Sequence, residues 1–210
     1  MSNKKKADGL VHISKMSGKL EGLKAISTNT LTNPFCVKMN EAKKETICSH
    51  CYSHSMLKGF RKNTAPALQR NSDLLSSKVL DLAELPTIKD EVFRFSAHGE
   101  LINITHLSNL FKICRKNSKT TFSLWTKRKD IVTKTLKLIP KPNNLILIYS
   151  NPKIGSILKN KPKGFDKTFN NVLEDEFKEE QNCTGQQCKD CLLCYQHNTT
   201  DTIVEMVKKY

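Results

Sequence analysis

Seven of the eight cysteines fall into two groups whose spacing is typical of metal ligands. In the first group, Cys36, Cys48 and Cys51 form a C-x11-C-x2-C pattern. A C-x2-C pair places two thiolates on one tight turn, and a third thiolate from an adjoining loop can complete one face of a metal cluster. Three protein ligands leave one coordination position open. Because sites closed by four ligands are usually structural, an open position favours a metal that binds substrate or takes part in catalysis.

Two histidines beside this pattern could change which metal the site binds. His50 or His54 could act as a fourth ligand and close a Cys3His zinc site. The spacing alone leaves zinc and iron-sulfur equally open, and three unligated thiols are the remaining alternative.

The second group of cysteines is denser. Cys183, Cys188, Cys191 and Cys194 form C-x4-C-x2-C-x2-C, which places four thiols within twelve residues. The first three match plant-type ferredoxin spacing and the last three match the bacterial C-x2-C-x2-C run, so we favour an iron-sulfur cluster. A four-cysteine zinc site is the alternative, although two C-x2-C pairs on separate turns would be more usual. The eighth cysteine, Cys114, shares one face of a predicted helix with apolar residues, and we expect a buried core thiol.

The charge of the chain indicates a polyanionic partner. Its 210 residues include 35 Lys and Arg against 20 Asp and Glu, for a net charge of +15. Nucleic acid is the obvious partner for such a surface. Lysines outnumber arginines and few aromatics lie near the basic runs, so we expect contacts to phosphate and no reading of bases. The alternative is a basic composition that only solubilises the surface.

No secretory signal and no apolar run of membrane-spanning length is visible in the sequence. We therefore expect a cytoplasmic protein with no membrane partner. In a protein that is not secreted, close cysteine groups favour metal binding over disulfides.

Strands and helices are predicted to alternate along the chain. Strands are predicted at 23–31, 91–97, 120–125 and 145–150, with one more around 167–173, and helices at 52–59, 64–82, 104–114, 129–138 and 202–210. Continuous apolar strands joined by helices indicate a parallel sheet covered by helices, so the predicted fold class is α/β.

In such folds the functional loops lie at the carboxyl ends of the strands. This rule gathers the first cysteine loop and residues 98–100, 126–128 and 150–151 at one end of the sheet. The residues at 98–100 and 126–128 also have interpretations that involve no function. Glu100 could cap the next helix, His98 could be a core residue at a strand end, and Lys127 with Arg128 could be solvated.

Taken in order, these motifs resemble the bacteriophage gene product 88 family, which is itself similar to radical S-adenosylmethionine enzymes. The motifs are Cys36, the C-x2-C-Y at 48–52, the strand followed by Gly-Glu at 93–100, FSLWTKR at 122–128 and the terminal four-cysteine run. The resemblance covers roughly residues 15–200.

The resemblance implies a role for each motif. In radical S-adenosylmethionine enzymes three cysteines hold a 4Fe-4S cluster, and the cofactor's amino and carboxylate groups chelate the open iron. Here the three cysteines would be those of the first group. Tyr52 would pack beside the cofactor, and Gly99 with Glu100 would bind its amino group. The terminal cysteines resemble the ligands of an auxiliary centre, either a second iron-sulfur cluster or zinc. The usual spacing of the first three cysteines is C-x3-C-x2-C, so the loop here is longer.

The same resemblance implies an architecture. We expect a partial (β/α) barrel of about four to six mostly parallel strands with a small C-terminal cysteine-rich metal-binding appendage. The predicted divisions are a flexible basic leader at 1–18, a radical S-adenosylmethionine-like α/β domain at 19–180, and the cysteine-rich metal site with a closing helix at 181–210.

The function that follows is a divergent radical S-adenosylmethionine iron-sulfur protein of phage type. It would need an external electron donor, would work in the cytoplasm of the bacterial host, and could act on nucleic acid, although the sequence does not identify the substrate. The alternative is a non-enzymatic module in which zinc or iron-sulfur sites staple a basic domain that binds nucleic acid or protein.

Overall fold

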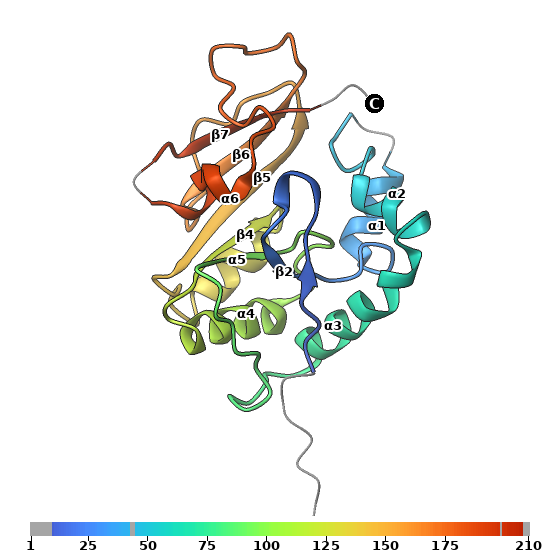
Figure 1. Cartoon of the computed structure of the whole chain (residues 1–210), viewed down its shortest axis with the longest axis vertical. Helices are drawn as coiled ribbons and strands as arrows, with labels where there is room; N and C mark the ends of the chain where they lie inside the picture. Colours follow the sequence, from blue (N-terminus) through green and yellow to red (C-terminus); the bar gives the residue numbers. More distant parts are fainter. Residues whose placement is uncertain (1–9, 43–44, 198, 208–210) are drawn as a thin grey trace, which may run out of the picture.

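Seven strands in the described part of the chain form one sheet, in which their spatial order follows their order in the sequence (Figure 1). The computed structural model describes residues 10–42, 45–197 and 199–207. The strands are β1 (Ser14–Lys15), β2 (Lys24–Ile26), β3 (Val92–Phe95), β4 (Thr121–Thr126), β5 (Leu145–Ile154), β6 (Lys167–Val172) and β7 (Thr202–Met206).

Helices connect and cover these strands. They are α1 (Pro34–Glu41), α2 (Tyr52–Lys58), α3 (Ala65–Ser77), α4 (Ile104–Lys116), α5 (Lys129–Leu136) and α6 (Cys188–Cys191), with short 3₁₀ helices at Gly18–Leu20, Lys62–Thr64 and Leu193–Tyr195. The predicted α/β class is confirmed. Neither α1 nor α6 was expected, because their residues were assigned to the first cysteine loop and to the terminal cysteine run.

The sheet is mostly parallel and open. Neighbouring strands from β2 to β7 run parallel, and only β1 pairs antiparallel with β2. The chain adds each new strand at the same side of the sheet, as in a (β/α) barrel, but β1 and β7 remain its two edges. The expectation of four to six strands is thus exceeded.

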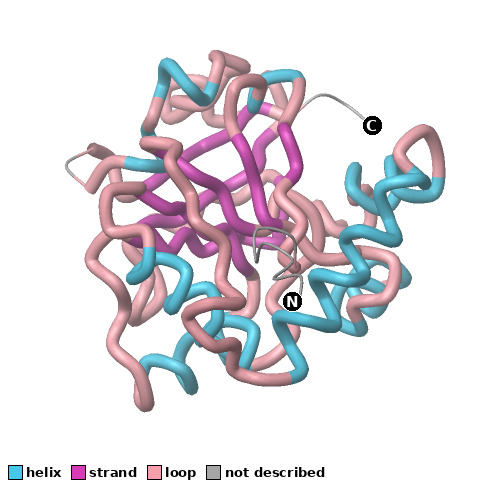
Figure 2. Tube along the Cα trace, turned by 60° about the horizontal axis from the view of Figure 1, so that its bottom comes forward, coloured by secondary structure: helices cyan, strands magenta, loops and turns pink. Residues whose placement is uncertain are grey.

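The two faces of the sheet are covered differently. On β3, Phe93 and Phe95 point into the larger core, which is formed with residues of α3, α4 and α5. On the next strand, β4, Phe122 and Leu124 join that core, whereas Trp125 belongs to the core on the opposite face. The opposite face is covered by the segment around Leu20 and by the C-terminal cysteine segment. Figure 2 shows the strands at the centre, with helices and long loops around them.

Helix α3 ends earlier than predicted. The helix predicted at 64–82 stops at Ser77, and Val79 and Leu82, which lie within the predicted range, are exposed. The side chain of Asn109 on α4 explains the early end, because its Nδ2 donates to the carbonyls of Leu75 and Lys78 and its Oδ1 accepts from Leu80. These bonds pair main-chain groups that a continued helix would have paired, so the chain can leave the helix without losing them.

The predicted closing helix at 202–210 is wrong for the residues that the structure describes. Thr202–Met206 forms β7, which pairs with β6 along its whole length. The run Thr202, Ile203, Val204 is β-branched and favours a strand. Residues 208–210 lie outside the described residues. The segment 181–210 therefore contributes a strand to the main sheet.

The prediction of a flexible leader at 1–18 does not hold for residues 10–18, which the structure describes. Residues 1–9 lie outside the described residues, but Val11 is buried in the larger core and β1 pairs with β2. The amide of His12 also donates to the side chain of Asn71 on α3 at 2.7 Å.

In the described part of the chain, no helix has both the length and the apolar character needed to cross a bilayer.

His106 should make the stability of the fold depend on pH. It is 2% exposed, and burial lowers its pKa to about 4 from the usual 6.5. Between these values the unfolded chain binds one more proton than the folded chain, so stability falls as pH decreases through this window, by roughly 3 kcal/mol in total. We expect His106→Gln to flatten this part of the curve in urea unfolding measured from pH 4 to 7. Equal pH dependence in the two proteins would contradict the assignment.

Candidate metal and cofactor site

Cys36 is held in the first turn of α1. The Oδ1 of Asn33 accepts hydrogen bonds from the amides of Phe35 and Cys36, at 3.0 and 3.3 Å, and Pro34 occupies the first helical position. An asparagine cap followed by proline is a strong helix start. The helix accounts for the long spacing between Cys36 and Cys48, because the additional residues form α1.

Cys48 and Cys51 lie on a turn that is fixed from two sides. Asn40 of α1 donates its side-chain amide to the carbonyl of Cys48 at 2.9 Å. On the other side, the amide of Ile47 donates to the carbonyl of Pro152 at 3.0 Å, which anchors the loop to β5. Cys51 then occupies the N-cap position of α2.

The three cysteines of the first group line one cavity of about 670 Å³. This volume is typical of small-molecule sites. The walls of the cavity also include Tyr52, His98, Gly99, Glu100, Lys127 and Ser150. The prediction that the loops after the strands gather at one end of the sheet is therefore confirmed. Neither His50 nor His54 is among the residues that line this cavity.

The thiols of the first group affect one another electrostatically. Burial raises the pKa of Cys36, and the nearby Glu100, Cys51 and Cys48 raise it further. Burial also raises the pKa of Cys48, while the ammonium of Lys127 opposes that shift. Without a metal, Cys36 and Cys48 are therefore protonated near neutral pH, and a metal that binds them must displace their protons.

Lys127 is the cation of this group. Burial lowers the pKa of Lys127, but the negative charges of the neighbouring cysteines in their thiolate form and of Glu100 outweigh that effect, so the pKa is raised. Its ammonium donates to the hydroxyl of Ser150 at 3.0 Å. The interpretation of Lys127 as a solvated surface residue is wrong. Arg128 next to it lies outside the cavity, where its guanidinium pairs with Asp130.

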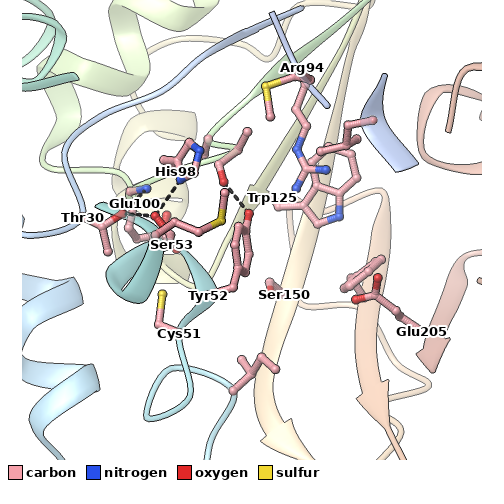
Figure 3. A pocket seen from close by; sticks show the side chains of 18 of the residues that line it. Thr30, Cys51, Tyr52, Ser53, Arg94, His98, Glu100, Trp125, Ser150 and Glu205 are labelled. Carbon is pink, nitrogen blue, oxygen red and sulfur yellow. Dashed lines mark hydrogen bonds between the residues drawn. The ribbon is translucent and has the colours of Figure 1, made fainter. Parts of the chain in front are cut away.

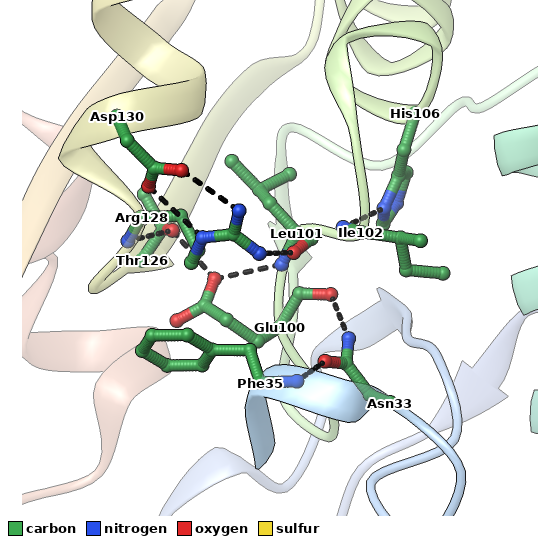
Figure 4. Close-up of polar contacts among 9 residues, drawn as sticks. All are labelled: Asn33, Phe35, Glu100, Leu101, Ile102, His106, Thr126, Arg128 and Asp130. Carbon is green, nitrogen blue, oxygen red and sulfur yellow. Dashed lines mark hydrogen bonds and ion pairs between the residues drawn. The ribbon is translucent and has the colours of Figure 1, made fainter. Parts of the chain in front are cut away.

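The carboxylate of Glu100 is buried and hydrogen-bonded (Figure 4). Its Oε1 accepts from the amide of Leu101 at 2.7 Å and from the hydroxyl of Thr126 at 2.5 Å, and its Oε2 accepts from the amide of Lys127 at 2.7 Å. A carboxylate offers about four acceptor positions, so one position on Oε2 remains for a ligand. Glu100 does not cap the following helix, because Asn103 is the N-cap of α4.

Gly99 is needed for close packing of two strand ends. Its φ is +73°, and a Cβ at this position would meet Thr28 Oγ1 at 2.2 Å. The hydroxyl of Thr28 and the side-chain amide of Asn33 both donate to the carbonyl of Glu100, at 3.3 and 2.8 Å. The Gly-Glu pair is thus fixed by backbone geometry before any ligand binds.

Tyr52 and His98 stand side by side at the cavity (Figure 3). The Tyr52 hydroxyl donates to the carbonyl of Ala97 at 2.5 Å, while the residue is 55% exposed. His98 is buried at the strand end, as its structural interpretation expects, and its Nδ1 shares a hydrogen bond with Ser53 Oγ at 2.8 Å. Burial, with help from Arg61 and Arg94, lowers the pKa of His98 to about 4.

The second group of cysteines also borders a common cavity. Cys183, Cys188, Cys191 and Cys194 all line a small cavity of about 20 Å³. Cys183 is held beside β7, because its amide donates to the carbonyl of Val204 at 3.0 Å. Three of the four, Cys183, Cys188 and Cys194, line the large cavity as well. Burial raises the pKa of Cys194 to about 12.

The donor sets can be compared with what a metal requires. Among the described residues, no three His, Cys, Asp or Glu side chains are arranged to hold a single metal ion. A cluster distributes its cysteine ligands over several iron atoms, so its thiols need not converge on one point. Three thiols around a large cavity and four around a small one suit clusters in donor type and number. Cys114 is fully buried in the core, as expected.

Two residues of the large cavity were missed by the sequence analysis. Arg94 and Trp125 both line it. The sequence feature that could have identified Arg94 lies in the predicted strand at 91–97, where a single arginine stands between two phenylalanines. A cation in the middle of an apolar strand indicates a polar interior on one face of the sheet.

Comparison with known proteins identifies the family of the chain. The Gene product 88 family matches residues 2–173, which includes the first cysteine group and the Gly-Glu motif. No curated protein and no solved structure matches the chain. Because the match extends over more than half of the sequence, the chain belongs to the Gene product 88 family of bacteriophages.

Proposed function

We propose that this protein is a small, divergent radical S-adenosylmethionine enzyme. The observation that carries the proposal is the large cavity, in which three cysteines and Glu100 face a common space at the carboxyl ends of the strands. The sequential parallel sheet supports it, since this is the strand order of a (β/α) barrel that has been left open.

Cys36, Cys48 and Cys51 would hold the 4Fe-4S cluster. A cluster bound there and reduced by an external donor would supply one electron for cleavage of S-adenosylmethionine to methionine and a 5′-deoxyadenosyl radical, and 5′-deoxyadenosine would form when that radical takes a hydrogen atom from the substrate. The protein's part is to position the cofactor and exclude water. The N-terminal cap of α1 and the anchoring of the loop to β5 fix the three thiols for this role.

Glu100 and Tyr52 would bind the cofactor. The remaining acceptor position on Glu100 Oε2 can receive the cofactor's amino group in a charge-assisted hydrogen bond. Gly99 keeps the strand ends close and therefore fixes the carboxylate. Tyr52 presents its ring to the same cavity, and its hydroxyl is tied to Ala97.

The terminal cysteines would hold a second centre, either an iron-sulfur cluster or zinc. They lie between β7 and the large cavity, with Trp125 and Tyr195 against them. In this position a metal would hold the C-terminal segment on the open face of the sheet.

The competing function is a non-enzymatic module in which both metal sites staple a basic domain. The net charge of +15 favours this second candidate. It predicts binding to nucleic acid or protein and no chemistry at the first cysteine group.

Cofactor cleavage separates the two functions. After anaerobic reconstitution and reduction with dithionite, we expect S-adenosylmethionine to yield 5′-deoxyadenosine, detected by chromatography. Cys48→Ala should abolish both binding and cleavage, because the cluster loses a ligand. Cys114→Ala should affect neither and serves as the control. A fully loaded cluster that gives no product, even with excess reductant, would contradict the enzymatic proposal.

Glu100→Gln should weaken S-adenosylmethionine binding by about tenfold or more while iron content stays unchanged, because a charge-assisted hydrogen bond is lost. The same change disturbs the bond from the amide of Lys127, so some stability is lost as well. Thr126→Val is the matched control, since it removes one hydrogen bond to the same carboxylate without touching the free acceptor position. Equal affinities in Glu100→Gln and wild type, measured by calorimetry, would remove the assignment.

Cys188→Ala tests the second centre. We expect metal analysis to show the loss of that centre. Thermal unfolding should show lower stability, because the bound metal no longer links the C-terminal cysteine segment to itself. Cys114→Ala again provides the control for loss of a thiol. Unchanged metal content would show that the four cysteines do not share a site.

The charge can be tested separately. If the surface contacts nucleic acid, affinity should fall with salt at a log-log slope of about −0.7 to −0.9 per phosphate neutralised. Filter binding to single-stranded and duplex DNA from low to physiological salt measures the slope. Absence of binding at low salt would exclude this partner.

A further inference from the structure

Arg94 lies on the face of the sheet opposite to the helices α3, α4 and α5. It lies on β3 between Phe93 and Phe95, which point to the helix-covered side, so its own side chain enters the large cavity. Its guanidinium stacks on the ring of Trp125, with Cζ at 3.9 Å from the ring centroid (Figure 3). The stacking holds the planar group in one orientation.

The guanidinium has no counter-ion in the described part of the chain. No ion pair is formed by Arg94 there, and its Nε is buried without a hydrogen-bond partner. Such an unpaired buried donor is costly, and the cost is recovered when an acceptor binds.

The other charges of the cavity are already engaged. Glu205 pairs with Lys19, and the carboxylate of Glu100 accepts three hydrogen bonds. Arg61 at the rim donates to Ser17. Four cations and two carboxylates line the cavity, so its interior favours an anion.

We propose that Arg94 binds a carboxylate or phosphate group of the substrate. The inference names a substrate class for the cavity of the proposed function, but it requires neither iron nor S-adenosylmethionine. A guanidinium edge matches the two oxygens of either group in a bidentate contact. The adjoining walls are apolar and aromatic, with Trp125, Phe169 and Leu20 among them. The expected substrate is therefore a small organic acid or phosphate ester with an apolar body.

A rival role for Arg94 is to compensate the charge of the terminal thiolates. Its positive charge lowers the pKa values of Cys183, Cys188 and Cys194 against the larger effect of burial. In that role Arg94 would be needed for metal loading at these cysteines, and no added anion would bind.

Calorimetric titration of the full-length protein tests the proposal, with benzoate and phenyl phosphate as anionic probes and benzamide as the neutral probe. Trp125 is the only tryptophan, so its fluorescence reports on the same site. We expect the anions to bind saturably and to change the fluorescence, and benzamide to do neither. The tighter of the two anions identifies carboxylate or phosphate as the preferred group.

Variants complete the test. Arg94→Gln should weaken anion binding by about tenfold or more. Arg94→Lys should restore part of the affinity, because it keeps the charge and loses the planar fork. Arg70→Gln, which removes an exposed arginine of α3 outside the cavity, should bind like wild type. Retained anion affinity in a folded Arg94→Gln would overturn the proposal, as would loss of metal in that variant with no anion binding in wild type. The anions should bind in the absence of S-adenosylmethionine, which separates this inference from cofactor binding.

Discussion

The carboxylate of Glu100 and the carbonyl of the same residue join four parts of the chain. Through them the segment after β3 is bonded to the end of β4, to the residues after β2 and to the cap of α1. A buried carboxylate is stable only when donors surround it. This requirement fixes the relative positions of the strand ends, and with them the first cysteine group. The site therefore depends on a structural hydrogen-bond network that leaves one acceptor position for a ligand.

The open sheet determines where chemistry can occur. Helices α3, α4 and α5 pack on one face, while the N-terminal and C-terminal segments only partly cover the other. Both cysteine groups and Arg94 therefore border one large cavity. Metal centres at the two groups would face the same bound molecule from different walls of that cavity.

Periodicity predicted the central strands and helices because their apolar residues pack on both faces of a parallel sheet. The candidate functional residues could be located as well, because they follow strands that the periodicity predicts. The periodicity did not predict the end of α3 or the start of α1. At these two places the side chains of Asn109 and Asn33 form hydrogen bonds with main-chain groups that have no main-chain partner. The periodicity also failed at β7, where the terminal run pairs with β6 although its spacing also fits a short helix. Arg94 was missed because its role depends on Trp125 of a neighbouring strand, which no local pattern reveals.

Electron paramagnetic resonance of the reduced protein, recorded with and without S-adenosylmethionine, tests the central claim most directly. A cluster held by Cys36, Cys48 and Cys51 with one open iron should give a signal that changes when the cofactor is added, because the cofactor binds that iron. In Cys48→Ala the change should disappear. Full loading with zinc and no iron, or an iron signal that the cofactor leaves unaltered, would contradict the account.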